Sequence, residues 1–361
     1  MKKIYLQVAL MLMICGFTAV IKASANKDTA VISTGINAIE NIQYVASTPL
    51  LVKSNSAAKT ALGFSKNGRA VEAYYFPGTS DKKALVIAGV HGSELSSVAI
   101  ARSLIQYLKN SPQAYYSVIV IPVLFPDNAV AAQNKPELIG GIENNGRYSC
   151  GNAADPNRQM PSLGKPYHAA AKDHLGRAIE TENKLLLELI NIYRPQRIVN
   201  IHAIRNPSKA GIYADPRTDA NGLALGYETD SSLAIEMAKY VHYNGGFIPG
   251  NHIDSIPSSL YYCDFPAAAT GTVQQRNLHG SKLSNHHGEG VSLGGWASTA
   301  VEDMAHPGYN RDAMRILTME FPGYKRPEDY TYITDQKYIE TIVNLYAASI
   351  QNVFLQKYFE E

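Results

Sequence analysis

The sequence predicts an α/β fold, built on a mixed, mostly parallel twisted sheet with helices on both faces. Short apolar runs typical of buried strands alternate along the chain with longer stretches in which apolar residues recur at helical spacing. A histidine or glutamate stands at the end of three of the apolar runs. Sites on such sheets form at the carboxyl ends of the strands, so these polar residues fit the same architecture.

The first half of the chain supplies three expected strands and one helix. Residues 71–76 and 84–90 form strands separated by the turn signal Gly78-Thr79-Ser80-Asp81, and residues 117–123 form a third strand. Glu94 opens a helix in which apolar side chains repeat at helical spacing, at Leu95, Val98, Ala101, Ile105 and Leu108. Residues 127–166 are rich in Gly and Asn, and we expect them to be irregular.

The second half repeats the alternation. Residues 180–193 form a helix that ends before Pro195, and one of its faces carries Leu185, Leu186, Leu189, Ile190 and Tyr193. Residues 197–201 form a short buried strand, and residues 232–243 form a helix closed by Asn244-Gly245-Gly246. After an irregular stretch at 246–311, we expect a strand at 316–321 and a terminal helix at 335–358.

The amino terminus is interpreted as a signal peptide at residues 1–25. Lys2 and Lys3 precede an apolar run, and Ala23-Ser24-Ala25 has the small-x-small form of a cleavage site. A retained membrane anchor is the alternative, although Gln7 interrupts the run. Residues 26–61 are interpreted as an N-terminal arm and residues 62–361 as one α/β domain. The mature protein is therefore expected to be exported, periplasmic or secreted, with no stable membrane anchor.

Charge and cysteine content narrow the possible partners. The whole chain carries a net charge of +2, and removal of the first 25 residues with Lys2, Lys3 and Lys22 lowers it to −1. This balance gives no indication of nucleic-acid binding. Cys150 and Cys263 are the cysteines of the mature chain. They could pair in an oxidising compartment, but two cysteines do not make a disulfide framework.

Three residues at strand ends form a candidate metal site. His91 and Glu94 are three residues apart in His91-Gly92-Ser93-Glu94, directly after an apolar strand, and His202 follows another apolar strand. Taken alone, a histidine in the position of His202 is more often a hydrogen-bonded core residue than a metal ligand. Together with His91 and Glu94, however, it completes a His₂Glu ligand set, a combination already known from carboxypeptidase A, which leaves a position open for water. We therefore expect one Zn²⁺ per chain.

Glu320 and two arginines could complete a hydrolytic site. Glu320 interrupts the apolar run Ile316-Leu317-Thr318-Met319, where a carboxylate serves either in a salt bridge or as a general base that activates water. Arg158, beside Asn157, could bind a substrate carboxylate through two parallel hydrogen bonds. Arg147 could polarise the scissile carbonyl, or it could be an ordinary loop arginine.

In these residues the chain resembles the zinc carboxypeptidases of family M14, from about residue 62 to the end. The resemblance rests on His91-Gly92-Ser93-Glu94, Asp155-Pro156-Asn157-Arg158, Asn200-Ile201-His202 and Thr318-Met319-Glu320 in this order. It implies that His91, Glu94 and His202 hold zinc, that Glu320 is the catalytic base, and that Arg147 supports the oxyanion. By the same resemblance Asn157 and Arg158 bind the substrate carboxylate.

The chain departs from the family pattern in two places. Phe125 stands where the resemblance would place an asparagine, and the tyrosine expected before Glu320 has no clear match, since neither Trp296 nor Tyr309 fits well. The metal chemistry is unaffected, but the side-chain preference is left open.

The function expected from the sequence is that of an exported zinc metallocarboxypeptidase. It would hydrolyse a peptide or peptide-like amide bond next to a residue with a free carboxylate, with cell-wall muropeptides among its substrates. The alternatives are an aspartoacylase-like zinc deacylase and a catalytically inactive peptide-binding module of the same fold.

Overall fold

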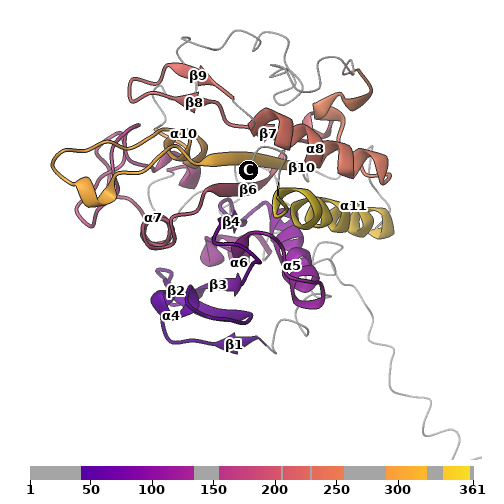
Figure 1. The fold of residues 1–361 in the computed structure, drawn as a ribbon, viewed down its shortest axis with the longest axis horizontal. Helices are drawn as coiled ribbons and strands as arrows, with labels where there is room; N and C mark the ends of the chain where they lie inside the picture. The colour runs from indigo at the N-terminus through magenta and orange to yellow at the C-terminus, as the bar shows by residue number, and fades with distance from the viewer. Residues whose placement is uncertain are drawn as a thin grey trace, which may run out of the picture.

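An eight-stranded mixed sheet with helices on both faces organises the protein (Figure 1). The computed structural model describes residues 42–133, 154–204, 206–227, 230–255, 290–322 and 336–357. The predicted fold class is confirmed. Over these ranges, no helix combines the length and the apolar character needed to cross a bilayer.

The sheet has the strand order β1-β2-β3-β5-β4-β6-β10-β7. Its four central strands run parallel to one another, whereas β2–β3, β3–β5 and β10–β7 are antiparallel pairs. A separate two-stranded sheet joins β8 and β9. The strands are β1 (Gln43–Tyr44), β2 (Ala58–Phe64), β3 (Ala70–Phe76), β4 (Lys83–Ile87), β5 (Ser117–Ile121), β6 (Arg197–Ile204), β7 (Gly211–Ala214), β8 (Arg217–Thr218), β9 (Ala224–Gly226) and β10 (Arg315–Pro322).

The helices cover the sheet in two layers. Figure 1 shows α5 (Leu95–Asn110), α8 (Asp230–Tyr243) and α11 (Gln336–Ser349) on one side of the sheet, and α7 (Thr181–Tyr193) and α10 (Leu293–Ala297) on the other. Two shorter helices are α4 (Thr48–Leu51) and α6 (Pro126–Gln133). Tyr193 ends α7 as expected, because Arg194 takes the left-handed conformation (φ 55°) in front of Pro195.

Alternate residues of each central strand enter different cores, one on each face. On β6, Val199 and Ile201 pack with α5, α8 and α11, whereas Ile198 packs with α7 and α10. On β10, Ile316 likewise belongs to the α7/α10 core. Because side chains alternate along a strand, Asn200, His202, Thr318 and Glu320 emerge on the α7/α10 face.

Several elements differ from the sequence expectations. The sheet begins before the expected boundary at Leu62. Strand β2 starts at Ala58 and pairs with β3, and β1, which starts at Gln43, pairs with β2. Helix α6 lies in a stretch expected to be irregular, and Pro126 and Asp127 suit its first turn. Strand β7 was not predicted, because four residues are too few for a periodic signal.

Two further differences concern the helices at the carboxyl end. The terminal helix ends at Ser349 and continues as a π-helical segment at Ile350–Phe354, instead of running unbroken to residue 358. Helix α10 and several short 3₁₀ segments lie inside the stretch expected to be irregular. The signal-peptide residues, Cys150 and Cys263 lie outside the described residues.

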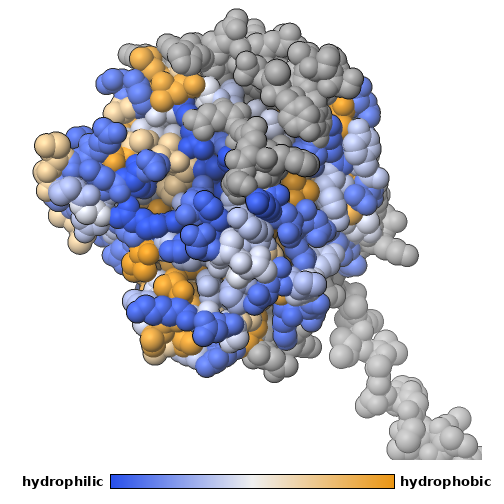
Figure 2. Space-filling view, viewed as in Figure 1, coloured by the Kyte–Doolittle hydropathy of each residue, from blue (hydrophilic) through white to orange (hydrophobic). Residues whose placement is uncertain are grey.

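The surface in Figure 2 is largely hydrophilic, with apolar side chains gathered over α4 and β2 at the lower end of the view. Leu50 and Phe64, on these two elements, are 54% and 61% exposed. Leu85 on β4, by contrast, is fully buried in the α7/α10 core.

We expect Leu85→Ala to lower the free energy of unfolding by about 2–5 kcal/mol, because it removes buried methyl groups and leaves a cavity beneath the site. Leu50→Ala is the matched control and should change stability by less than about 0.5 kcal/mol. Urea denaturation followed by circular dichroism measures both. Equal losses in the two variants would contradict the described core.

Candidate metal centre

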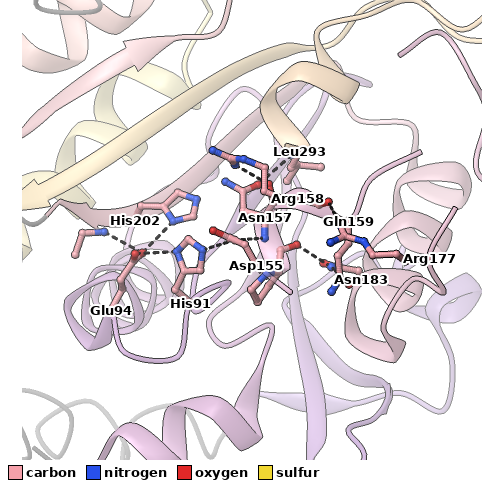
Figure 3. A network of polar contacts seen from close by, with 12 residues as sticks. His91, Glu94, Asp155, Asn157, Arg158, Gln159, Arg177, Asn183, His202 and Leu293 are labelled. Atoms are coloured by element: carbon pink, nitrogen blue, oxygen red, sulfur yellow. Dashed lines mark hydrogen bonds and ion pairs between the residues drawn. The ribbon is translucent and has the colours of Figure 1, made fainter. Parts of the chain in front are cut away.

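Three buried residues from two strand ends converge on one point, as the sequence predicted. His91 and Glu94 follow β4, and His202 lies on β6. The Nδ1 atom of His91 lies 2.8 Å from Glu94 Oε1, and the Nδ1 atom of His202 lies 2.9 Å from Glu94 Oε2. Figure 3 shows both imidazole rings joined to the Glu94 carboxylate by dashed lines. One ligand atom from each residue lies within 4.8 Å of the others, and all three residues are buried.

Gly92 allows the turn that carries the first two of these residues. A Cβ atom at this position would collide with the backbone of Asn128 and Ala129 at the start of α6. The turn therefore packs directly against a helix, and only glycine leaves enough space there. The backbone amide of Ala203 donates to Glu94 Oε2 at 3.1 Å, which holds the carboxylate against β6.

Asp155 orients the ring of His91 by contacting Nε2, the ring nitrogen that does not face Glu94. Its Oδ1 atom lies 2.8 Å from Nε2 of His91 and accepts a hydrogen bond from the backbone of Asn157, also at 2.8 Å. A proton on Nε2 leaves the Nδ1 lone pair facing Glu94, which is the arrangement that a metal ligand needs. The sequence patterns did not indicate this role, although Asp155 stands in the same segment as Asn157 and Arg158.

The electrostatics of this cluster favour a cation. Burial by itself would lower the pKa of His91, but the negative charges and hydrogen bonds of Glu94 and Asp155 raise it to about 9. The two imidazoles hold the pKa of Glu94 well below its ordinary value in spite of its burial. Sites of this kind retain a proton when empty and release it when a metal binds.

The ligand set fits a zinc ion. Two imidazole nitrogens and one carboxylate oxygen are donors that Zn²⁺ prefers, and three protein ligands leave a further position open. The orienting contact from Asp155 is the second layer of support that metal-binding histidines commonly have. Among the described residues, the buried Nε2 atom of His202 has no hydrogen-bond partner. The ring therefore directs only its Nδ1 atom to a partner, and that partner is Glu94.

Glu320 lies next to this cluster on the neighbouring strand. It pairs in register with His202 across the parallel strands β10 and β6, so both side chains emerge on the same face. Its other neighbour is Gly211 on β7, and the ring of Tyr213 covers that glycine closely. Burial raises the pKa of Tyr213, and the nearby charge of Glu320 adds to the effect. Tyr213 therefore lies near Glu320, a proximity that the sequence did not indicate.

Asn157 and Arg158 lie beside the cluster in the short 3₁₀ segment η2 (Pro156–Arg158). The Oδ1 atom of Asn157 accepts from the backbone of Leu293 at 3.1 Å, which joins the segment to α10. Nη1 of Arg158 donates to the carbonyl of Asn157 at 2.7 Å, and Arg177 donates to the carbonyl of Arg158 at 2.8 Å (Figure 3). Arg147 lies outside the described residues, so its expected role stays a prediction.

Comparisons with known proteins identify similar folds at low sequence identity. The chain resembles carboxypeptidase A from Helicoverpa armigera with a TM-score of 0.47 and 14% identity, over 83% of this chain and 68% of that one. It also resembles the murein-tripeptide amidase MpaA from Escherichia coli O157, with a TM-score of 0.42 and 18% identity, over 82% of this chain and 95% of that one. No family model and no curated protein matches the sequence. Because both TM-scores are below 0.5, the activity has to be inferred from the site residues themselves.

We expect Asp155→Asn to weaken zinc binding by about 10–100-fold, because an amide in this position cannot compensate the charge on His91 or select its tautomer as a carboxylate does. Competition with a chromogenic chelator measures the affinity. His202→Ala, which removes a ligand, should lose more affinity, and Asp312→Asn on the exposed surface should lose none. Wild-type affinity in Asp155→Asn would show that this contact does not support the metal site.

Proposed function

We propose that the protein is an exported zinc-dependent metallocarboxypeptidase of the M14 type. It hydrolyses a peptide or peptide-like amide bond next to a residue with a free carboxylate, with cell-wall muropeptides among its substrates. The single observation that supports this proposal best is the convergence of His91, Glu94 and His202 beside Glu320, which is in register with His202. Export is proposed from the basic start, the apolar run and the Ala23-Ser24-Ala25 sequence.

A zinc ion held by the three residues would supply Lewis-acid activation of water and of the scissile carbonyl. Glu320 would take the proton of the attacking water and deliver it to the leaving amine. Its place on the same face as His202, one strand away, suits this role, because a general base has to come within hydrogen-bond reach of the proton that it abstracts.

Arg158 would bind the free carboxylate of the substrate. A guanidinium can grip a carboxylate with two parallel hydrogen bonds, which a lysine cannot reproduce. The contacts of its backbone with Arg177, and of Asn157 with Leu293, hold the segment in place before a substrate arrives. Asp155 links this segment to the metal ligands, since one carboxylate oxygen contacts both His91 and Asn157. The cleaved bond would therefore lie at a set distance from the bound carboxylate.

Glu320→Gln should keep the fold and the bound zinc but lose turnover by about 10²–10⁴-fold, because glutamine is nearly isosteric and cannot accept the proton. Steady-state rates on a peptide acid, together with zinc content by atomic emission, test this expectation. The exposed Glu302→Gln serves as the control. An unchanged kcat with normal zinc would assign Glu320 a purely structural role.

Arg158→Lys should reduce the discrimination between a peptide acid and its amide, mainly through a higher KM for the acid, because the charge remains while the planar fork is lost. The measurement compares kcat/KM for one acid and its amide in both proteins. Arg194→Lys, whose side chain contacts the 308–310 turn, is the matched control. If the wild type cleaves acid and amide equally well, a deacylase or endopeptidase replaces the proposed activity.

A further inference from the structure

A cavity of about 620 Å³ lies between the β2–β3 turn, the start of α6 and the start of α7. The turn contributes Lys66 and Asn67, α6 contributes Asp127 and Asn128, and residues 177–182 lead into α7. Of the described residues that line this cavity, none is a proposed ligand of zinc or of the substrate. Its volume is within the range, roughly 300–1,000 Å³, of sites that bind small molecules.

The buried acidic group of this cavity is Glu182, in the first turn of α7. Glu182 is 6% exposed, and among the residues that the structure describes its carboxylate contacts only its own backbone amide. Burial raises its pKa, and the charges of Glu180 and Asp127 add to the effect. Arg69 contacts Asp127 at 2.7 Å, whereas no cation in the described chain pairs with Glu180 or Glu182. A buried carboxylate without a cation is costly, so a positively charged ligand would be stabilising there.

Gln159 presents a donor to the same cavity. It is 2% exposed, and its Oε1 atom accepts from the backbone amide of Glu180 and from Nδ2 of Asn183, both at 3.2 Å. These two donors fix the orientation of the side-chain amide, and its Nε2 group finds no acceptor among the described residues. Figure 3 shows Gln159 beside Asn183, away from His91. The cavity therefore lacks an acceptor at Gln159 as well as a cation at Glu182.

Arg177 also lines the cavity, but its charge is already compensated. Its Nε atom contacts Oδ2 of Asp173 at 2.5 Å, and its Nη2 atom donates to the carbonyl of Arg158 at 2.8 Å. Lys66, at the exposed rim, has no partner in the part of the chain that the structure describes. The wall thus presents one positive group and one acidic pair that await partners. A ligand that matches it carries both charges, an ammonium group and a carboxylate.

We propose that this cavity is a second binding site, which takes a zwitterionic amino acid. The ammonium group of the ligand binds to Glu182 and Glu180. Its carboxylate accepts from Lys66 and from the Nε2 group of Gln159. An ammonium group offers three donors and a carboxylate accepts through two oxygens, so one α-amino acid satisfies both sides of the wall. The inference goes beyond the proposed hydrolysis and does not depend on it.

Calorimetry with the zinc-loaded protein compares leucine with two analogues that each lack one charged group. These are 4-methylpentanoate, without the ammonium group, and 3-methylbutylamine, without the carboxylate. We expect the wild type to bind each analogue at least about tenfold more weakly than leucine, because one buried group is then left unpaired. Glu182→Gln should weaken the binding of leucine by a similar factor but leave that of 4-methylpentanoate unchanged. Glu188→Gln, at an exposed position of the same helix and outside the cavity wall, is the matched control and should bind leucine like the wild type.

Arg158→Lys distinguishes this cavity from the candidate active site. Leucine binding that persists in Arg158→Lys and is weakened in Glu182→Gln would support the cavity, whether or not the protein hydrolyses any peptide. Failure of the wild type to bind leucine, or to prefer it to 4-methylpentanoate, would overturn the proposal, and these two measurements do not depend on the folding of a variant. Binding lost in Arg158→Lys but retained in folded Glu182→Gln would assign the ligand to the active site and would also overturn it.

Discussion

Eight consecutive residue pairs join β6 to β10 in parallel register, and the geometry of the site depends on this pairing. It places Glu320 beside His202 and Thr318 beside Asn200 on one face of the sheet. A shift of one residue would turn each of these side chains to the opposite face, into the core formed with α5, α8 and α11. The apolar residues between them, Ile201 and Met319, are fully buried on that face and hold the register.

The second constraint is the cost of burying charge. Glu94 is 7% exposed, and an isolated carboxylate at such a position would be strongly destabilising. Two imidazoles and the backbone amide of Ala203 share its two oxygens. The carboxylate of Asp155 contacts the other ring nitrogen of His91 and compensates the positive charge of that ring. The cluster is thus a chain of alternating acceptors and protonatable rings, and a divalent cation at its centre would replace the proton that it otherwise holds.

The segment around residues 155–159 connects this cluster to the helical layer. Asn183 of α7 donates to the carbonyl of Pro156 at 2.9 Å, and Asn157 accepts from the first residue of α10 at 3.1 Å. Arg158 is therefore positioned by contacts with two helices as well as by its own loop. Such support matters for recognition, because a bidentate pair with a carboxylate requires the guanidinium to be held in a defined orientation.

The sequence by itself determined the strands β3, β4, β5, β6 and β10, the helices α5, α7 and α8, and the three residues of the candidate metal centre. These elements are long and periodic, and the ligands stand directly after apolar strands, so local patterns were sufficient. The early start of the sheet, α6, β7 and the contacts of Asp155 with His91 and of Asp215 with Thr318 were decided by the tertiary structure. Asp155 and His91 are 64 residues apart, and Asp215 and Thr318 are 103 residues apart. Contacts between residues so distant leave no periodic signal along the chain, because they exist only once the strands have paired.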